Sequence, residues 1–386
     1  METKNNTKIA FFLSSFRAGG GERVTVDLAN GFAERGYSVD LLVMKPVGPY
    51  KEQVNPKVNL ISVDAGRIIF SLPKVIDYFR KTPPEVIVAI DEYTHLMALA
   101  GRWRTGAKTR VILRMGNMMP ELFKRYGGKS KFLPVLVRRF YKYADGVIAN
   151  SKGVRDSIIE VTGIDEKRVS VIFNPKLLPV IHSLMKEEVS YDWLTKKTLP
   201  VAVAVCRLRE QKNLEFLIRA FAKASSVVPS RLIIVGAGRD GVRLQEMTRE
   251  ISADDRVSFA GYQENPYAFM AKSDIFVSAS LWEGLPNAVI EALVCGMPVI
   301  SSDCDSGPRE ILAPDTDYRG RLKKGLEYAQ YGVLTAVNDE DALVSALTKM
   351  LTDSALRQKY SDLAKDRMLV FDFPKILDEY AKEMGI

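Results

Sequence analysis

The 386-residue sequence is poor in metal-binding and disulfide-forming side chains, with only two histidines and three cysteines. His95 and His182 are not spaced as metal ligands, so a histidine-based metal site is not expected. Cys206, Cys295 and Cys304 are odd in number and lie in or beside apolar segments. They are interpreted as small buried side chains of a protein from a reducing compartment.

Long apolar runs are also missing, since none approaches the roughly 18 residues that a membrane-spanning helix needs. The apolar run at residues 9–13 is too short for the core of a signal peptide and is interpreted as a first strand. A content of 47% hydrophobic and 26% charged residues is typical of a soluble globular protein. The length exceeds that of one ordinary core, so two domains are expected.

Short β-rich apolar segments alternate with helical patterns along the chain. In residues 22–35, for example, Val24, Leu28 and Phe32 recur at a spacing of four. The alternation predicts an α/β class with doubly wound parallel sheets. Strands are expected at residues 8–14, 38–44, 58–63, 85–90, 110–115, 146–150 and 168–172, and then at 201–207, 231–236, 256–261, 274–280 and 297–302.

Residues 173–200 interrupt the alternation. This segment is rich in Lys and Pro and lacks periodicity, so it is interpreted as a linker between two doubly wound domains. Residues 314–330 are polar and are interpreted as a mobile insertion. Ligands of open α/β sheets bind at the carboxyl ends of strands, so functional motifs are sought there.

A run of three glycines, Gly19, Gly20 and Gly21, follows the first predicted strand and precedes a helix beginning at Glu22. Glycine allows a ligand to approach the backbone closely, and a helix N-terminus favours anions. A flexible turn is the alternative. Three glycines exceed what a turn needs, which favours a binding loop.

Two cations follow the strand predicted at residues 201–207. Arg207 at the strand end and Lys212 in the loop could clamp a diphosphate. On these residues alone, a solvated surface loop is an equally good interpretation.

The segment after the next strand has the pattern Gly-x-Gly-x-x-Gly at Gly236, Gly238 and Gly241. Asp240 would place a carboxylate where a pyrophosphate should lie, and the motif is not in the first βαβ unit. A tight strand-to-helix turn is therefore favoured over a nicotinamide-dinucleotide site.

Two glutamates, Glu283 and Glu291, lie eight residues apart in an apolar segment predicted to be a turn and a buried helix. A buried glutamate without a partner is costly. Carboxylates are good acceptors for pairs of sugar hydroxyls, so each glutamate could bind one pair. A charge at a helix N-terminus and a structural ion pair are the alternative. Ser306 and Gly307, after the following strand, offer further donors.

The segment EGLPNAVIEA, which carries both glutamates, resembles the signature of glycosyltransferase family 4. The segments GGGE, RLREQKN, IIVGAGRD and SGPREI fall in the family's order at comparable spacings. The resemblance covers nearly the whole chain and is strongest over residues 201–312. The segment CDSGPREIL is similar to enzymes that extend lipid-linked or cell-surface glycans.

The resemblance implies a GT-B fold, in which two Rossmann-like domains face a central cleft. Residues 1–180 and 370–386, the latter with a last helix that crosses back, would form the acceptor-binding domain. Residues 195–369 would bind a nucleotide-sugar donor.

The resemblance also implies the site. Arg207 and Lys212 would neutralise the donor diphosphate, Glu283 would hold donor-sugar hydroxyls, and Glu291 would hold the ribose. Both glutamates would then be satisfied by ligand and not by protein. The catalytic residues would be Arg207, Lys212 and Glu283. The donor-binding set would be Gly20, Gly21, Arg207, Lys212, Gly236, Gly284, Leu285, Asn287 and Glu291.

One departure concerns the acceptor side. Many family members have a histidine in the N-terminal domain near the reacting carbon, where this sequence has Arg114 and Asn117. Arg114 is expected to contact the acceptor or a phosphate on it. Glu22, Arg114 and Asn117 are the predicted acceptor-binding residues.

The implied reaction is retaining and metal-independent, with no cofactor. A hexosyl or N-acetylhexosaminyl group would move from a nucleotide sugar, expected to be a UDP-sugar, to a hydroxyl of a lipid-linked glycan. Two cations can stabilise the leaving diphosphate without a metal. A nucleotide-sugar epimerase and a non-catalytic donor-binding subunit remain the alternatives.

The net charge of +8 is concentrated in one segment. Residues 102–142 hold twelve Lys or Arg and one acidic residue, Glu121, a local net charge of +11. Interleaved aromatics suit an anionic membrane surface, so we expect a cytoplasmic protein on the inner face of the membrane. Nucleic acid is the second interpretation, disfavoured because no nucleic-acid motif accompanies the charge, and a solvated face is the other alternative. Leu133, Leu136, Val137 and Phe140 fall at the spacing of a helix core face.

Overall fold

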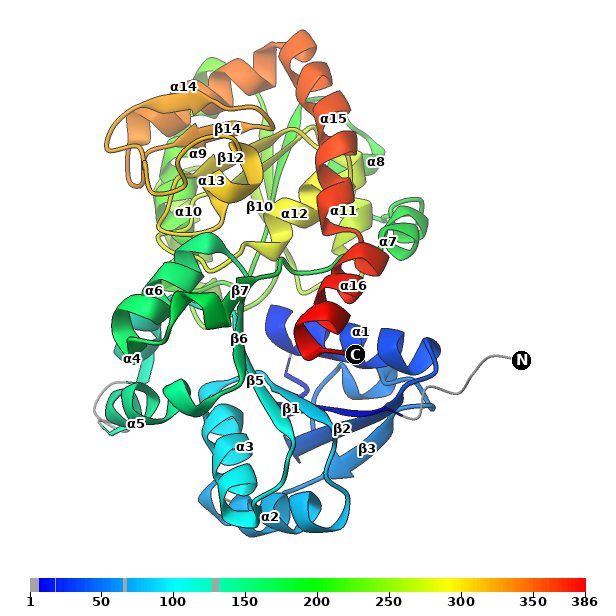
Figure 1. The fold of residues 1–386 in the computed structure, drawn as a ribbon. Helices are drawn as coiled ribbons and strands as arrows, with labels where there is room; N and C mark the ends of the chain where they lie inside the picture. The colour runs from blue at the N-terminus through cyan, green and yellow to red at the C-terminus, as the bar shows by residue number, and fades with distance from the viewer. Residues whose placement is uncertain (1–6, 18, 65–67, 127–131) are drawn as a thin grey trace. The chain divides into compact units, whose positions relative to one another are not determined.

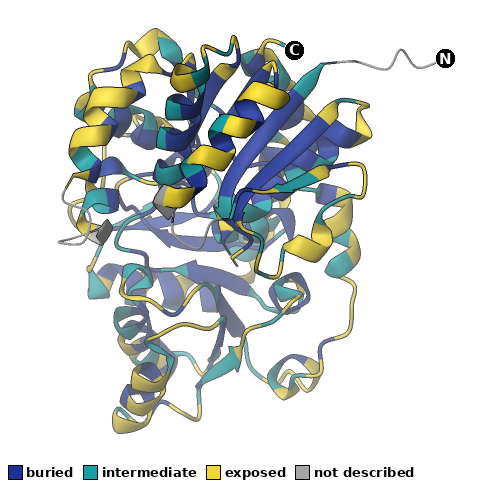
Figure 2. Cartoon of the chain, turned by 90° about the horizontal axis from the view of Figure 1, so that it is seen from below, coloured by how far each residue is buried: buried dark blue, intermediate teal, exposed yellow. Residues whose placement is uncertain are grey.

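The structure, a computed structural model, describes residues 7–17, 19–64, 68–126 and 132–386. The chain forms two compact units. The first is Met1–Pro175 together with Pro374–Ile386, and the second is Lys176–Phe373. Within each unit, the strands are buried and the helices that cover them turn exposed faces outward (Figure 2).

The first unit is built on a seven-stranded sheet in the order β3-β2-β1-β4-β5-β6-β7, with every pair parallel (Figure 1). The order reverses between β1 and β4, as in Rossmann-like folds. All seven predicted strands are confirmed. They are β1 (Lys8–Ser15), β2 (Ser38–Lys45), β3 (Asn59–Ser62), β4 (Val86–Ala89), β5 (Arg110–Met115), β6 (Gly146–Ala149) and β7 (Val169–Val171).

The helices of this unit begin and end at local signals. The Asp91 side chain caps α3 in a capping box with Thr94, and Gly163 ends α6 in the left-handed conformation. The helices are α1 (Gly20–Glu34), α2 (Leu72–Lys81), α3 (Glu92–Thr105), α4 (Met119–Tyr126), α5 (Leu133–Phe140), α6 (Lys152–Thr162) and α16 (Phe373–Met384), with short 3-10 turns at Lys51–Gln53, Ile68–Ser71, Tyr141–Tyr143 and Glu166–Arg168.

The last helix, α16, packs on the first unit through polar contacts as well as its apolar face. Arg35 forms an ion pair with Asp378 at 2.6 Å. Arg110 donates to the carbonyl of Met384 at 2.7 Å, and Ser170 donates to the carboxylate of Glu383. The C-terminal helix is therefore an integral part of this unit.

The second unit has a seven-stranded sheet in the order β10-β9-β8-β11-β12-β14-β13, parallel except for β13 against β14. The five predicted strands are confirmed. The strands β13 and β14 are absent from the prediction, and β13 lies in the polar segment 314–330 that was interpreted as a mobile insertion. The strands are β8 (Val201–Val205), β9 (Arg231–Val235), β10 (Val257–Gly261), β11 (Ile275–Ser278), β12 (Val299–Ser302), β13 (Leu326–Tyr328) and β14 (Val333–Thr335).

The segment interpreted as a linker, residues 173–200, is mostly part of the second unit. It forms two helices, α7 and α8, that are too short to show a helical period in the sequence. The unit's helices are α7 (Leu178–Leu184), α8 (Asp192–Thr195), α9 (Leu214–Val227), α10 (Gly241–Glu250), α11 (Pro266–Lys272), α12 (Asn287–Val294), α13 (Pro308–Leu312), α14 (Glu340–Thr352) and α15 (Ser354–Met368), with 3-10 turns at Glu210–Lys212 and Leu369–Phe371.

The segment interpreted as a mobile insertion, residues 314–330, is tied to this unit by buried charges. Arg309 forms ion pairs with Asp303 at 2.6 Å and with Glu327 at 2.8 Å. The backbone N–H of Leu322 donates to the Asp303 carboxylate at 2.8 Å. These ion pairs, the hydrogen bond from Leu322 and the strand β13 hold the polar segment against the rest of the unit.

Candidate active site

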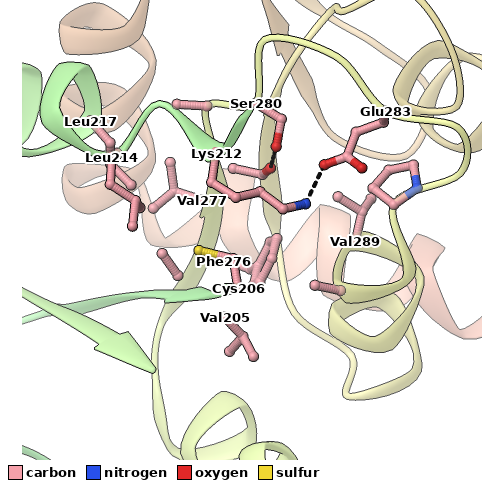
Figure 3. A pocket seen from close by; sticks show the side chains of 15 residues that line it. Val205, Cys206, Lys212, Leu214, Leu217, Phe276, Val277, Ser280, Glu283 and Val289 are labelled. Carbon is pink, nitrogen blue, oxygen red and sulfur yellow. Dashed lines mark hydrogen bonds and ion pairs between the residues drawn. The ribbon is translucent and has the colours of Figure 1, made fainter. Parts of the chain in front are cut away.

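The loop after β8 and the turn after β11 meet through a buried ion pair. Lys212 donates a hydrogen bond to Oε1 of Glu283, and the two side chains point toward each other in Figure 3. Gln211 donates to the carbonyl of Trp282 at 2.8 Å and to Oε2 of Glu283 at 3.4 Å. Both carboxylate oxygens of Glu283, a side chain only 8% exposed, therefore have protein partners.

The charge on Lys212 is maintained by its surroundings. Burial is the largest influence and opposes the ammonium form, but the charge and hydrogen bond of Glu283, together with the neighbouring Cys206 and Cys304, give a net rise in the pKa of Lys212. Burial also raises the pKa of the neighbouring Cys206 thiol to about 11, so this cysteine is a neutral thiol at pH 7. Lys212 therefore keeps its positive charge at pH 7 and its ion pair with Glu283.

Arg207 lies two residues beyond β8, and its side chain is exposed. It makes no hydrogen bond or ion pair with any residue that the structure describes. A guanidinium without a protein carboxylate can accept a phosphate group in its planar fork. Arg207 therefore differs from Lys212, whose ammonium group is already paired.

A small cavity lies beneath the Lys212–Glu283 pair. Its walls are mainly apolar side chains of β8, α9, β11 and α12, including Val205, Leu214, Phe276 and Val289 (Figure 3). Apolar walls lower the local dielectric and strengthen the interaction of the ion pair.

The glycine pattern after β9 serves close backbone packing. Gly236 has a φ of +140°, and a Cβ there would lie 1.8 Å from the carbonyl oxygen of Cys206. A Cβ on Gly238 would lie 2.2 Å from the carbonyl oxygen of Leu208. These contacts support a tight strand-to-helix turn, and donor binding at Gly236 stays a prediction.

The loop after β12 packs on the turn that carries Glu283. Ser306 donates to the carbonyl of Gly284 at 2.8 Å. Gly307 has a φ of +91°, and a Cβ there would lie 2.5 Å from Cδ of Pro286. The structure thus brings this loop against the predicted donor residues Gly284 and Leu285, with Asn287 beginning α12.

Glu291 is held by a second lysine. Nζ of Lys176 lies 2.7 Å from Oε1 of Glu291, and the side chains are 6% and 13% exposed. The expectation that both glutamates depend on ligand is wrong, because each is paired with a lysine. Lys176 and Lys212 are distant from their partners in sequence, so no local pattern could reveal the pairs.

In the first unit, the glycine run forms the start of α1. The helix begins at Gly20, and Gly19 precedes it in an extended conformation without a side-chain cap. A Cβ on Gly21 would lie 3.8 Å from Nη1 of Arg114, so the loop borders this guanidinium. Glu22 lies in the helix's first turn.

Arg114 is buried and holds secondary-structure elements together. Its Nε donates to Oη of Tyr380 at 2.9 Å, and its Nη2 donates to Oδ1 of Asn174 at 2.6 Å. Nη1, next to Gly21, has no hydrogen-bond partner among the described residues. Asn117 is exposed, beyond the end of β5, so the structure does not bury these two predicted acceptor residues together.

Asn150, at the end of β6, is a polar side chain that the sequence analysis missed. Among the described residues, its buried Oδ1 has no hydrogen-bond partner, and its Nδ2 makes a single contact, at 3.4 Å, with the carbonyl of Gly116. Its position within a predicted strand gave no signal beyond its polarity.

The basic segment is partly neutralised. Arg102 pairs with Asp145, and Lys124 pairs with Glu121 at 2.6 Å. The side chains of Arg125, Lys129 and Lys131 lie outside the described residues.

The apolar side chains of the basic segment are partly on the surface. Leu133 and Val137 are buried as predicted, but Leu136 and Phe140 are 39% and 41% exposed. The spacing suggested one core face, whereas α5 is too short and peripheral to bury all four side chains. Other exposed apolar side chains are Trp103, Phe132 and Val135 in the segment and Tyr143 directly after it.

The described residues contain no group of three or more His, Cys, Asp or Glu side chains arranged to hold a metal ion. None of their helices is long and apolar enough to cross a membrane.

Comparison with known families gives matches over most of the chain. The model for glycosyltransferase family 4 matches residues 18–175, and the model for glycosyl transferases group 1 matches residues 185–367.

Relatives support the same assignment. The chain is 31% identical over 331 residues to an uncharacterised glycosyltransferase of Methanocaldococcus jannaschii, covering 80% of each chain. It is 27% identical over 384 residues to the N-acetylgalactosamine-N,N'-diacetylbacillosaminyl-diphospho-undecaprenol 4-alpha-N-acetylgalactosaminyltransferase of Campylobacter jejuni, covering 97% of this chain and 98% of the relative.

A solved structure of HepE from Anabaena in complex with UDP-glucose aligns with a TM-score of 0.79 at 20% identity, covering 98% of this chain and 100% of that one. The fold prediction, an α/β protein of the GT-B class with two Rossmann-like domains, is confirmed by the two sheets and these structural relatives.

Proposed function

Since the chain belongs to glycosyltransferase family 4, we propose that it is a retaining enzyme that transfers a hexosyl or N-acetylhexosaminyl group from a UDP-sugar to a lipid-linked glycan. The observation that carries this proposal is the Lys212–Glu283 ion pair, with the exposed cation Arg207 earlier in the same loop after β8. It provides fixed charges at the carboxyl ends of β8 and β11, where α/β proteins bind ligands.

The donor is proposed from charge and from a relative. Arg207 and Lys212 are suited to a diphosphate, and HepE of Anabaena is described in complex with UDP-glucose. In the bound complex, Glu283 would accept hydrogen bonds from hydroxyls of the donor sugar. Glu291 would accept hydrogen bonds from the ribose hydroxyls. Gly20 and Gly21 would approach the phosphates.

The acceptor is proposed from the Campylobacter relative, whose name specifies a diphospho-undecaprenol glycan. Glu22, Arg114 and Asn117 stay the acceptor-binding hypothesis. The fit is weakest at Arg114, because two of its guanidinium nitrogens are already bound by Tyr380 and Asn174.

The proposed mechanism needs no metal and no covalent intermediate on the protein. Lys212 and Arg207 would stabilise the charge of the leaving diphosphate. Both glutamates are paired with ammonium groups, which suits binding more than nucleophilic attack. The attacking hydroxyl would approach the donor from the side of its leaving group and give its proton to a phosphate oxygen. Activity is therefore expected to persist in EDTA, and a loss reversed by Mg²⁺ would contradict this mechanism.

The exposed aromatics among the cations of residues 102–142 support docking on an anionic membrane surface. We place the enzyme on the inner face of the cytoplasmic membrane, where it would meet a lipid-linked acceptor. Nucleic acid is not proposed as a partner.

The experiment that tests the donor is a thermal-shift panel of UDP-, GDP- and ADP-sugars with the purified protein. A bound donor stabilises the folded state by mass action. UDP-sugars should raise the melting temperature most. A protein stabilised by no nucleotide sugar would contradict the proposal. Donor turnover without any acceptor would instead favour an epimerase, and binding without transfer a non-catalytic subunit.

A further inference from the structure

The two glutamates of the candidate site differ in how their oxygens are used. Glu283 has a partner on each oxygen, Lys212 and Gln211. Glu291 has Lys176 on Oε1 at 2.7 Å, whereas its Oε2 receives no hydrogen bond from any residue within the described part of the chain. One oxygen of Glu291 is thus held by Lys176, and the other can accept a hydrogen bond from a ligand.

The backbone of Lys176 is held by hydrogen bonds at both its N–H and its carbonyl group. Its N–H donates to the carbonyl of Phe371 at 2.7 Å, and its carbonyl accepts from the N–H of Phe373 at 3.0 Å. This pairing forms a parallel bridge with Asp372, and the Lys176 side chain is only 6% exposed. The ammonium group therefore reaches Glu291 from a fixed backbone.

A purely structural ion pair explains this arrangement less completely. Burying two charges costs desolvation, and apolar side chains of similar volume often stabilise as well. Oε2 of Glu291 is not among the described buried atoms that lack a partner, so it keeps accessible surface where a hydrogen-bond donor can bind. A ligand hydroxyl at Oε2 would supply that donor.

We infer that Lys176 is a positioning residue for the nucleotide ribose. Its ion pair with Oε1 orients the Glu291 carboxylate so that Oε2 accepts hydrogen bonds from the ribose hydroxyls. Because the Glu291 carboxylate is held in place before the nucleotide binds, less side-chain conformational freedom is lost on binding. The inference rests on the proposed function, since it requires that Glu291 contacts the nucleotide.

The test compares two ligands that share base and diphosphate, UDP and 2′,3′-dideoxy-UDP, by isothermal titration calorimetry. With the unmodified protein, UDP should bind about tenfold more tightly, as expected for hydrogen bonds to a charged group. In Lys176→Met, UDP should bind about tenfold more weakly, while 2′,3′-dideoxy-UDP should change by less than about twofold. The preference for the ribose hydroxyls should therefore largely disappear.

Lys197→Met is the matched control. Lys197 also forms a 2.7 Å ion pair in the second unit, with Asp274, but at the amino end of β11. This variant should keep both the affinity for UDP and the preference over the dideoxy compound.

The double variant Lys176→Met/Glu291→Gln covers the case in which Lys176→Met alone fails to fold, since it leaves no unpaired carboxylate. If Lys176 acts through Glu291, the double variant should bind UDP within about twofold of Glu291→Gln alone. A further tenfold loss would overturn the inference, because Lys176 would then act independently.

Two other results would also overturn it. Equal weakening of UDP and 2′,3′-dideoxy-UDP in Lys176→Met would indicate a general structural role. An unchanged preference in that variant would show that Lys176 does not position the ribose. If the unmodified protein remained folded but bound neither compound, the proposed function itself would be contradicted. That result differs from the two above, which contradict only the role of Lys176.

Discussion

Lys212 donates a hydrogen bond to Oε1 of Glu283, so two side chains predicted to bind different parts of the donor form one buried ion pair. Neither charge can be removed without leaving the other unpaired in a weakly exposed position. Substitutions at either residue must therefore be judged against stability as well as activity.

The first prediction concerns the diphosphate clamp. Arg207→Ala and Lys212→Ala should each reduce kcat/KM for the donor, equivalent to roughly 2–4 kcal/mol of lost transition-state stabilisation. Arg207→Ala should leave the melting temperature unchanged because its side chain is exposed, whereas Lys212→Ala should lower it. Steady-state kinetics and thermal unfolding measure the two effects.

Arg249→Ala, which removes an exposed arginine from α10, is the control for the clamp and should be neutral. Near-parental turnover in both clamp variants would show that these cations do not stabilise the leaving group.

The second prediction separates the glutamates. Glu283→Gln should reduce transfer and alter the preference among donor sugars, because it changes the acceptor for sugar hydroxyls. Glu291→Gln should weaken binding of free UDP by about tenfold, since the ribose is present in UDP itself. Calorimetry with UDP distinguishes the variants, and equal loss of UDP affinity in both would remove the division of roles.

The third prediction uses the buried His95. Its Nε2 lies 3.1 Å from the carbonyl oxygen of Ala89, so that nitrogen carries the proton, and Nδ1 lies 2.6 Å from Oη of Tyr141. Burial, assisted by the nearby charge of Arg114, lowers the pKa of His95 to about 3. The neutral imidazole is therefore the native form.

Because this folded-state pKa lies below the ordinary value of 6.5, the unfolded chain binds the proton more readily. His95 contributes its full stability above pH 6.5 and loses it as the pH falls toward 3. Urea denaturation of the parent and of His95→Gln should give curves whose difference in stability changes by up to about 1.4 kcal/mol per pH unit in this window. Parallel dependence on pH in both proteins would contradict the assignment.

The fourth prediction concerns the membrane surface. The protein should sediment with anionic liposomes at low salt and remain in the supernatant at high salt, since the attraction is screened. Changing Arg138, Arg139 and Lys142 to Ser should abolish sedimentation. Changing Arg249, Lys359 and Lys365 of the second unit to Ser should not. Equal binding to neutral and anionic vesicles, or none at low salt, would favour a soluble acceptor.

Much of the fold could be predicted because buried parallel strands are apolar on both faces, as in β1 and β8. The strand β13 and the helix α8 were missed, since both are short and lie in segments whose polar or aperiodic sequence was interpreted as an insertion or a linker. A periodic pattern also could not show that α5 leaves Phe140 on the surface.

For the candidate site, the residue types and their order along the chain indicated the chemistry. The pairing of Glu291 with Lys176 could not be predicted, because the residues are 115 positions apart and Lys176 lies in a segment without a pattern. Burial and backbone geometry can be predicted from neighbouring residues in the sequence. The partners of charged side chains cannot, because they depend on the tertiary fold.

The most direct test of the central claim is to incubate the purified protein with a UDP-sugar and an undecaprenyl-diphosphate-linked glycan, and to determine the linkage of the product by NMR. The account predicts a glycan extended by one sugar with the α-configuration of the donor. A product with the inverted configuration would contradict the retaining mechanism. Absence of transfer from every UDP-sugar to every lipid-linked glycan tested, by protein that binds UDP, would contradict the proposed function.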